Sequence, residues 1–221
     1  MNTQSEEDPQ QYVHNLLLNP VTISITRDGK VLEWGSGFLV GKDRVLTAAH
    51  VVDAVRNGDV IVVDHHGMRS TGRTIAIGAR ATNDAAIVAL DTPRLVRIAQ
   101  PPRLCATATE VGARLVVMSA NGATYTFSAP MKGYGSEGNN GVSATTTWFG
   151  PGASGSAVID LGRHCLAGVV SQSARTVGST TVDEKTIEVV DQSTLLADGP
   201  SVLTVVEKLP VEDATRAVLG R

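Results

Sequence analysis

The sequence lacks several features that mark particular classes of protein. Its 221 residues include only 2 cysteines, and no stretch approaches the roughly 18 consecutive apolar residues that span a bilayer. There is no long basic run and the formal net charge is −3, so we expect neither nucleic acid nor an anionic membrane as a partner. Cys105 and Cys165 are too few for a disulfide scaffold and lie in no CxxC motif. We therefore expect free thiols, which is compatible with a reducing compartment.

Short β-branched segments separated by turn residues make up most of the chain, which holds 22 Gly and 9 Pro. The Asp28-Gly29 pair between two such segments is typical of a hairpin turn. The predicted strands cover 21–25, 31–40, 41–52, 59–64, 73–79 and 85–90, and then 113–119, 123–129, 142–149, 156–160, 165–172 and 185–191. Because no long helical crossover separates consecutive strands, a parallel sheet is disfavoured, and two antiparallel barrels or sandwiches are favoured.

Helical and proline-rich segments surround these two groups of strands. Pro9, followed by apolar residues at helical spacing, predicts a short amphipathic helix that ends near Asn19. Residues 92–104 contain three prolines, which do not fit central strands, so this segment is predicted to connect the two halves. Pro200 and Pro210 each open a helix-like stretch, which predicts one or two helices at the C-terminal end.

A serine stands between glycines in the segment Gly152-Ala153-Ser154-Gly155-Ser156, just after one predicted strand and before the next. Flanking glycines let the backbone turn sharply, so the N–H groups of Gly152 and Ser154 could point together at a developing oxyanion. Taken alone, such a loop is more often an ordinary Gly/Ser turn. The interpretation therefore depends on what accompanies the serine.

Two earlier residues supply the partners that a nucleophilic serine needs. His50 ends the apolar run LTAAH, and Asp84 opens DAAIVAL. A serine hydroxyl is a poor nucleophile at neutral pH, so an imidazole must take its proton and a carboxylate must hold that imidazole in the correct tautomer. His50, Asp84 and Ser154 together are thus a candidate catalytic triad.

The blocks that carry these residues resemble those of the trypsin/chymotrypsin-like serine peptidases. They are GSGFLV at 35–40, VLTAAHVV at 45–52, DAAIVAL at 84–90 and GPGASGSAV at 150–158. VGARLVVMS at 111–119 is similar to the opening of the family's second barrel, and LAGVVSQS at 166–173 to its substrate-flanking strand. The resemblance covers roughly residues 20–192, and the blocks occur in the family order.

The resemblance implies an all-β fold of two six-stranded antiparallel β-barrels, with short N- and C-terminal helices packed outside. The expected divisions are a tail and short helix over 1–19, a first barrel over 20–98, a linker over 99–104, a second barrel over 105–192 and a C-terminal helical segment over 193–221. The catalytic cleft is expected between the two barrels.

The resemblance also implies roles for individual residues. His50 is the general base and acid, Asp84 its orienting carboxylate and Ser154 the nucleophile, with the N–H groups of Gly152 and Ser154 as the oxyanion hole. Ala153 stands where the zymogen branch of the family has an aspartate that pairs with a newly cut N-terminus. We therefore expect a site that forms without proteolytic activation, as in the Deg-type bacterial and viral polyprotein proteases, which this chain resembles more closely.

Residues that would border the substrate are predicted on the same basis. They are Trp148, Phe149, Ser171, Gln172 and Ser173. None is acidic, so cleavage after Lys or Arg is disfavoured, because a buried cation would lack a partner. A small or medium uncharged residue is the expected preference. Trp148 and Phe149 are equally well explained as core aromatic residues of the second barrel.

Two other functions compete with peptide hydrolysis by a serine endopeptidase. An α/β-hydrolase needs a G-x-S-x-G elbow followed by the acid and then the histidine, but residue 156 is serine and the order is wrong. A catalytically silent protease-like module that binds protein is the alternative that remains. A protease acting on its own precursor or on a polyprotein has the same chemistry in another role.

The expected partner is a polypeptide, and the mechanism needs no metal and no organic cofactor. The first residues, MNTQSEEDPQQ, are acidic and polar, whereas a signal peptide is basic and then apolar. We therefore expect no signal peptide and no transmembrane segment, and a location in the cytoplasm or, for a viral protein, in the interior of the host cell.

Overall fold

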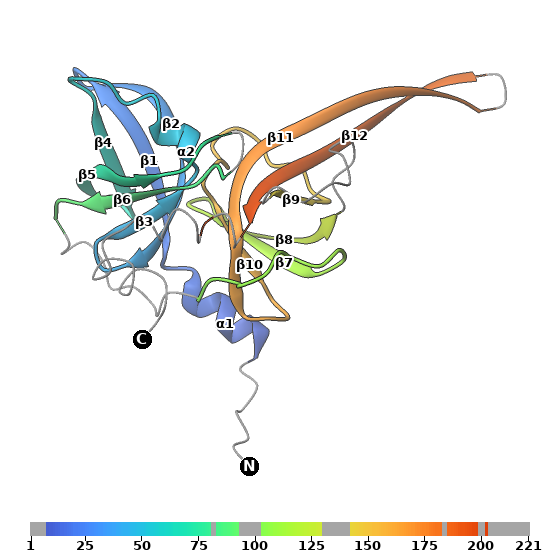
Figure 1. The fold of residues 1–221 in the computed structure, drawn as a ribbon, viewed down its shortest axis with the longest axis horizontal. Helices are drawn as coiled ribbons and strands as arrows, with labels where there is room; N and C mark the ends of the chain where they lie inside the picture. Colours follow the sequence, from blue (N-terminus) through green and yellow to red (C-terminus); the bar gives the residue numbers. More distant parts are fainter. Residues whose placement is uncertain are drawn as a thin grey trace, which may run out of the picture.

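The structure is a computed structural model that describes residues 8–80, 83–92, 103–129, 142–182, 185–198 and 202, with the backbone alone at 9, 142–143, 172–195 and 197–198. Its architecture is two barrels side by side (Figure 1).

The first barrel is closed by six antiparallel strands in the order β1-β2-β3-β6-β5-β4. The strands are β1 (Pro20–Arg27), β2 (Lys30–Gly41), β3 (Arg44–Thr47), β4 (Val60–His65), β5 (Met68–Ile77) and β6 (Ala86–Leu90). The predicted turn at Asp28-Gly29 joins β1 to β2, with φ angles of 49° and 75°. Positive φ at both positions is what a tight hairpin turn requires.

The second barrel is also closed, in the order β10-β11-β12-β9-β8-β7. Its strands are β7 (Arg114–Ser119), β8 (Gly122–Ala129), β9 (Val142–Thr145), β10 (Ala157–Asp160), β11 (Cys165–Val182) and β12 (Lys185–Asp198). All pairings between named strands are antiparallel. The predicted fold class of two six-stranded antiparallel barrels is confirmed.

Two strands of the second barrel are longer than predicted. β11 and β12 stay paired from Gly168↔Asp198 to Val182↔Lys185, and they project from the barrel as a long hairpin (Figure 1). β12 also continues to Asp198, so the second barrel does not end at residue 192 as expected. β9 is shorter than the predicted strand over 142–149, which leaves Trp148 and Phe149 in a loop.

Two named helices flank the barrels in the part of the chain that the structure describes. α1 (Pro9–Leu16) begins after Asp8, whose carboxylate accepts a hydrogen bond from the Gln10 N–H, and α2 (Ala49–Val52) is a single turn that carries His50. The predicted N-terminal helix is thereby confirmed, while the predicted C-terminal helices lie outside the described residues except for Val202, which is helical and buried. Neither of these described helices is long and apolar enough to cross a membrane.

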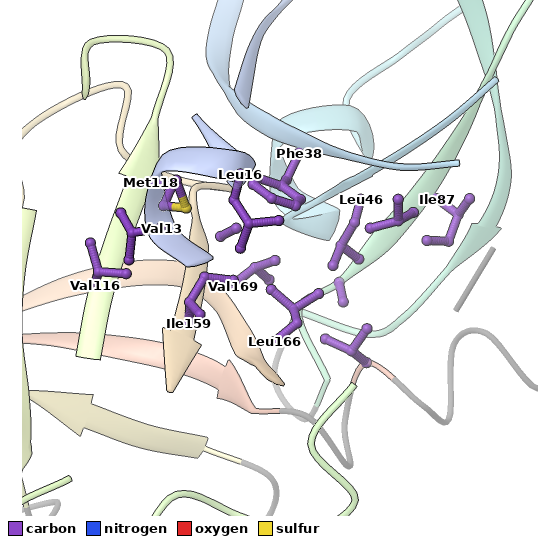
Figure 2. Close-up of a cluster of buried hydrophobic side chains, with 14 of the residues drawn as sticks. Val13, Leu16, Phe38, Leu46, Ile87, Val116, Met118, Ile159, Leu166 and Val169 are labelled. Carbon is purple, nitrogen blue, oxygen red and sulfur yellow. The ribbon is translucent and has the colours of Figure 1, made fainter. Parts of the chain in front are cut away.

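A shared hydrophobic core joins α1 to both barrels. Val13 and Leu16 from the helix are buried against Phe38 of the first barrel and against Met118 and Ile159 of the second (Figure 2). Each barrel has a further cluster of its own. The helix thus bridges the two barrels, and in the view of Figure 1 it lies below them while α2 lies near the top.

A disulfide joins Cys105 to Cys165, so the expectation of free thiols was wrong. Cys105 follows the connector between the barrels, and its N–H donates to Leu166 of β11. This backbone pairing brings the two residues together across 60 positions of sequence. Sequence spacing could not reveal the pairing, because it depends on how residues 103–105 pair with Leu166 of β11.

Candidate active site

His50 lies at the boundary of the first barrel, where β3 turns into α2. Ala49, Val51 and Val52 of the same turn are buried in the core of this barrel, which fixes the backbone of the helix. The His50 side chain is 13% exposed, so its ring is held by its surroundings but still reaches the surface.

Asp84 contacts His50 twice. One carboxylate oxygen accepts the backbone N–H of His50 at 2.9 Å, and the other lies 2.7 Å from Nδ1 of the ring. A carboxylate partner at Nδ1 favours the tautomer with the proton on that nitrogen. The other ring nitrogen, Nε2, is then left as a proton acceptor, which is the state a general base requires.

A third group completes the environment of Asp84. The hydroxyl of Ser171, in β11 of the second barrel, donates to the same oxygen that faces Nδ1, at 2.5 Å. Burial alone would raise the pKa of Asp84, but the hydrogen bonds from the His50 ring and from Ser171 outweigh it and leave the pKa below its ordinary value. Asp84 is therefore a carboxylate at neutral pH even though its side chain is only 3% exposed.

Ser154 lies in the loop before β10, close to the same group of residues. Its hydroxyl donates to the backbone carbonyl of Ser171 at 3.2 Å. Within the described part of the chain, no hydrogen bond joins this hydroxyl to His50. Ser171 thus contacts Asp84 through its side chain and Ser154 through its backbone.

The loop that carries Ser154 is held in a sharp bend. Gly152 and Gly155 have φ angles of 83° and 85°, which favour glycine. Within the loop, Ala153 N–H donates to Gly150, and Gly155 N–H donates to Val170 of β11. Among the hydrogen bonds of the described residues, none uses the N–H of Gly152 or of Ser154. These two donors are the ones that the sequence predicted for an oxyanion hole.

The structure brings some of the predicted substrate-binding residues to this site. Ser171 is buried beside Asp84 and Ser154. Trp148 is 47% exposed in the loop before Ser154, whereas Phe149 packs against the core of the second barrel. Gln172 and Ser173 continue β11 and pair with Leu195 and Thr194, and their side chains lie outside the described part.

Sequence reasoning missed three residues of the first barrel that contact the Ser154 loop or support its contacts. They are Trp34, Ser36 and Thr47. Ser36 and Thr47 were included in the blocks that carry the family resemblance, but of those two blocks only His50 was assigned a role. Because these contacts join β2 to a loop in the other barrel, no local sequence pattern could indicate them.

The two six-stranded antiparallel barrels define the class of the chymotrypsin-like double barrels. The chain belongs to the family described as the trypsin-like peptidase domain, whose model matches residues 35–169. The resemblance seen in the sequence is thereby confirmed. The chain matches none of the curated proteins with which it was compared.

Solved structures with the same fold come from bacterial proteases. The active form of the Rv3671c protease from M. tuberculosis has a TM-score of 0.60 and 20% identity, over 91% of this chain and 87% of that chain. Its inactive form has a TM-score of 0.58 and 21% identity, over 90% and 93%. The serine endoprotease from Yersinia pestis has a TM-score of 0.55 and 18% identity, over 77% and 60%. At these identities the likeness establishes the fold.

Proposed function

We propose that this protein is a serine endopeptidase in which Ser154 is the nucleophile, His50 the general base and acid, and Asp84 the residue that orients the ring. The observation that carries the proposal is the double contact of Asp84 with His50, to the backbone at 2.9 Å and to Nδ1 at 2.7 Å. A histidine that only filled a core position would not need a buried carboxylate that holds Nδ1 and leaves Nε2 as a proton acceptor.

The reaction proceeds through an acyl-enzyme. Rotation about the Cα–Cβ bond of Ser154 moves the hydroxyl from the Ser171 carbonyl to Nε2 of His50. The oxygen attacks the substrate carbonyl while its proton passes to His50, and the oxyanion accepts hydrogen bonds from the N–H groups of Gly152 and Ser154. The C–N bond then breaks as His50 returns the proton to the leaving amine. Water, deprotonated by His50, releases the acid and restores Ser154.

The site forms without cleavage of a precursor. In the zymogen branch, an aspartate before the nucleophile needs a new N-terminus, whereas Ala153 has no charge to pair. Its N–H instead donates to Gly150 within the same loop. The bend that holds Ser154 is thus supported by a contact that needs no new N-terminus.

The substrate preference follows from the residues that precede Ser154 and from those that continue β11. Trp148, Phe149, Ser171, Gln172 and Ser173 offer no carboxylate to a cationic side chain, so a small or medium uncharged residue is favoured. The substrate is a polypeptide. A separate protein, a precursor of this chain and a polyprotein are alternatives that share this chemistry. Location in the cytoplasm or a host-cell interior stays a prediction. The Cys105–Cys165 disulfide makes the predicted location testable, because disulfides persist in oxidising compartments. Titration of the two thiols in this protein, taken from fresh extracts, shows whether the bond is formed in the cell.

Labelling with a fluorophosphonate, followed by peptide mass mapping, tests the proposal. Stoichiometric adduct on Ser154 in the folded protein is expected, with none in Ser154→Ala and none after heat denaturation. Adduct on other serines, or on denatured protein to the same extent, would remove the basis for an activated nucleophile. A peptide library then defines the preferred residue.

One observation favours the alternative of a catalytically silent module that binds protein. The Ser154 hydroxyl is bonded to Ser171 rather than to His50. If this arrangement were permanent, the serine would not be activated. The labelling experiment separates the two functions, because the silent module leaves Ser154 unlabelled in native protein while a binding assay with peptides still gives a signal.

A further inference from the structure

Ser36, in β2 of the first barrel, uses all three of its polar groups at the junction of the two barrels. Its hydroxyl donates to the carbonyl of Gly152 at 2.7 Å, and its N–H donates to the carbonyl of Ser154 at 2.7 Å. Its own carbonyl accepts the hydroxyl of Thr47, also at 2.7 Å. The side chain is buried, with the residue 4% exposed.

The bond to Gly152 fixes one peptide group of the Ser154 loop at both ends. The carbonyl of the Gly152–Ala153 peptide is held by the Ser36 hydroxyl, and its N–H donates to Gly150. Rotation of this peptide would change ψ of Gly152 and φ of Ala153, the angles on either side of it. Those angles set the direction of the neighbouring N–H groups of Gly152 and Ser154.

Trp34 closes the other side of the same glycine. A Cβ atom built on Gly152 would collide with the ring of Trp34, so the backbone rests directly against the indole. Trp34 is 50% exposed, so its ring contacts the loop and also meets solvent. The ring limits movement of Gly152 toward β2, and the Ser36 hydroxyl limits its rotation.

Thr47 connects this contact to His50. It ends β3, is fully buried and is followed at once by Ala48 and the helical turn that carries His50. The chain of bonds from Thr47 through Ser36 to Gly152 therefore runs from the strand before the general base to the loop of the nucleophile. This is a direct link between the two halves of the site.

We propose that Ser36 is a positioning residue whose side-chain hydroxyl holds the Gly152–Ala153 peptide so that the oxyanion hole is formed before substrate binds. The proposal rests on the proposed peptidase function. It assigns to the hydroxyl a role in stabilising the transition state and none in binding the ground state, because the hydroxyl faces the loop and not the substrate.

Ser36→Ala tests this role, and Ser70→Ala is the matched control. Ser70 is a serine of the same barrel, also 4% exposed, whose hydroxyl donates to a backbone carbonyl, that of Thr71. For Ser36→Ala we expect kcat to fall about 10- to 100-fold with KM changed less than about twofold, since a buried carbonyl loses its donor. A peptidyl trifluoromethyl ketone, which forms an oxyanion on the enzyme, should bind more weakly by a similar factor.

Amide hydrogen exchange gives a readout that does not depend on activity. In Ser36→Ala, peptides that cover 150–156 should exchange about 10-fold faster, while those of the two barrel cores keep their protection. Ser70→Ala should leave the exchange of this loop unchanged. Ser36→Thr, which restores a hydroxyl at the same position, should recover kcat to within about threefold of the parent protein.

The outcomes separate the two proposals. If the parent protein does not react with a fluorophosphonate, the peptidase function fails, and the exchange of 150–156 alone decides whether Ser36 holds the loop. If the parent protein is active but Ser36→Ala keeps both its kcat and its affinity for the trifluoromethyl ketone, the positioning role is wrong. Loss of protection throughout both barrels in Ser36→Ala would also overturn it, since the residue would then support the fold as a whole.

Discussion

The two barrels contribute to the candidate site in different ways. The first barrel supplies His50 and Asp84, which contact each other directly within that barrel. The second supplies Ser154 on a loop that is fixed partly by its own β11, through Val170, and partly by Ser36 of the first barrel. The His50–Asp84 pair is thus formed within one barrel, whereas the position of Ser154 depends on the contact between the barrels. Substitutions in the two barrels should therefore differ in how much they lower turnover and stability.

The largest effect is expected from removing the nucleophile or the base. Ser154→Ala and His50→Ala should each lower turnover on the order of a millionfold, because the parts of a triad act as a unit. Turnover of a cleaved peptide measures this. The two single variants and the double variant should be about equally inactive; multiplied losses in the double variant would show that the two residues act independently.

Asp84→Asn should lower turnover less than these variants but still on the order of 10,000-fold, because an amide at this position favours the wrong tautomer of His50. The fold should persist, since the amide can still accept the backbone N–H of His50. Peptide turnover beside far-ultraviolet circular dichroism checks both parts. Near-normal turnover in a folded Asp84→Asn would mean that the carboxylate does not orient the ring.

Removal of the disulfide should affect stability more than chemistry. The bond closes a loop of 60 residues, so Cys105→Ser with Cys165→Ser should lower the free energy of unfolding by about 3 to 4 kcal/mol. Denaturant unfolding of the variant and of the parent protein, with and without reductant, measures this. Reductant should destabilise only the parent protein. If reductant destabilised both proteins equally, its effect would not come from the Cys105–Cys165 disulfide.

The smallest effect concerns stability in acid. The pKa of Asp84 is lowered in the folded protein, so its ionisation stabilises the fold above the ordinary carboxyl pKa, and this contribution is lost as the pH falls through the lowered pKa. Ser171→Ala removes one of the hydrogen bonds that lower this pKa, so the acid-dependent loss should shrink. Chemical denaturation at a series of pH values from neutral to about 3 tests the sign. A larger acid-dependent loss of stability in Ser171→Ala than in the parent protein would contradict this prediction.

The sequence was sufficient for the elements that local patterns determine. Alternating β-branched segments and the Asp28-Gly29 turn predicted strands and a hairpin that the barrels contain, and Pro9 with its apolar spacing predicted α1. The roles of His50, Asp84 and Ser154 were predicted from short blocks in family order. The structure places the first two in contact and Ser154 within reach of their neighbour Ser171.

The features that sequence did not predict are contacts between distant segments. The Cys105–Cys165 bond depends on the backbone pairing of residues 103–105 with β11, and the contact of Ser36 with Gly152 crosses between the barrels. The extension of β11 and β12 also escaped prediction, because the segment over 173–182 is rich in Ser, Thr and Gly. Such residues favour turns when considered alone, whereas here pairing with the partner strand determines the conformation.

The most direct test of the account is the rate at which a fluorophosphonate modifies Ser154 in the parent protein and in His50→Ala, measured at neutral pH with unfolding curves for both. If His50 activates Ser154, the second-order rate constant should fall by at least about 1,000-fold in the variant while the fold is retained. Equal rates in the two folded proteins would show that the serine is not activated by His50, and would contradict the proposed mechanism.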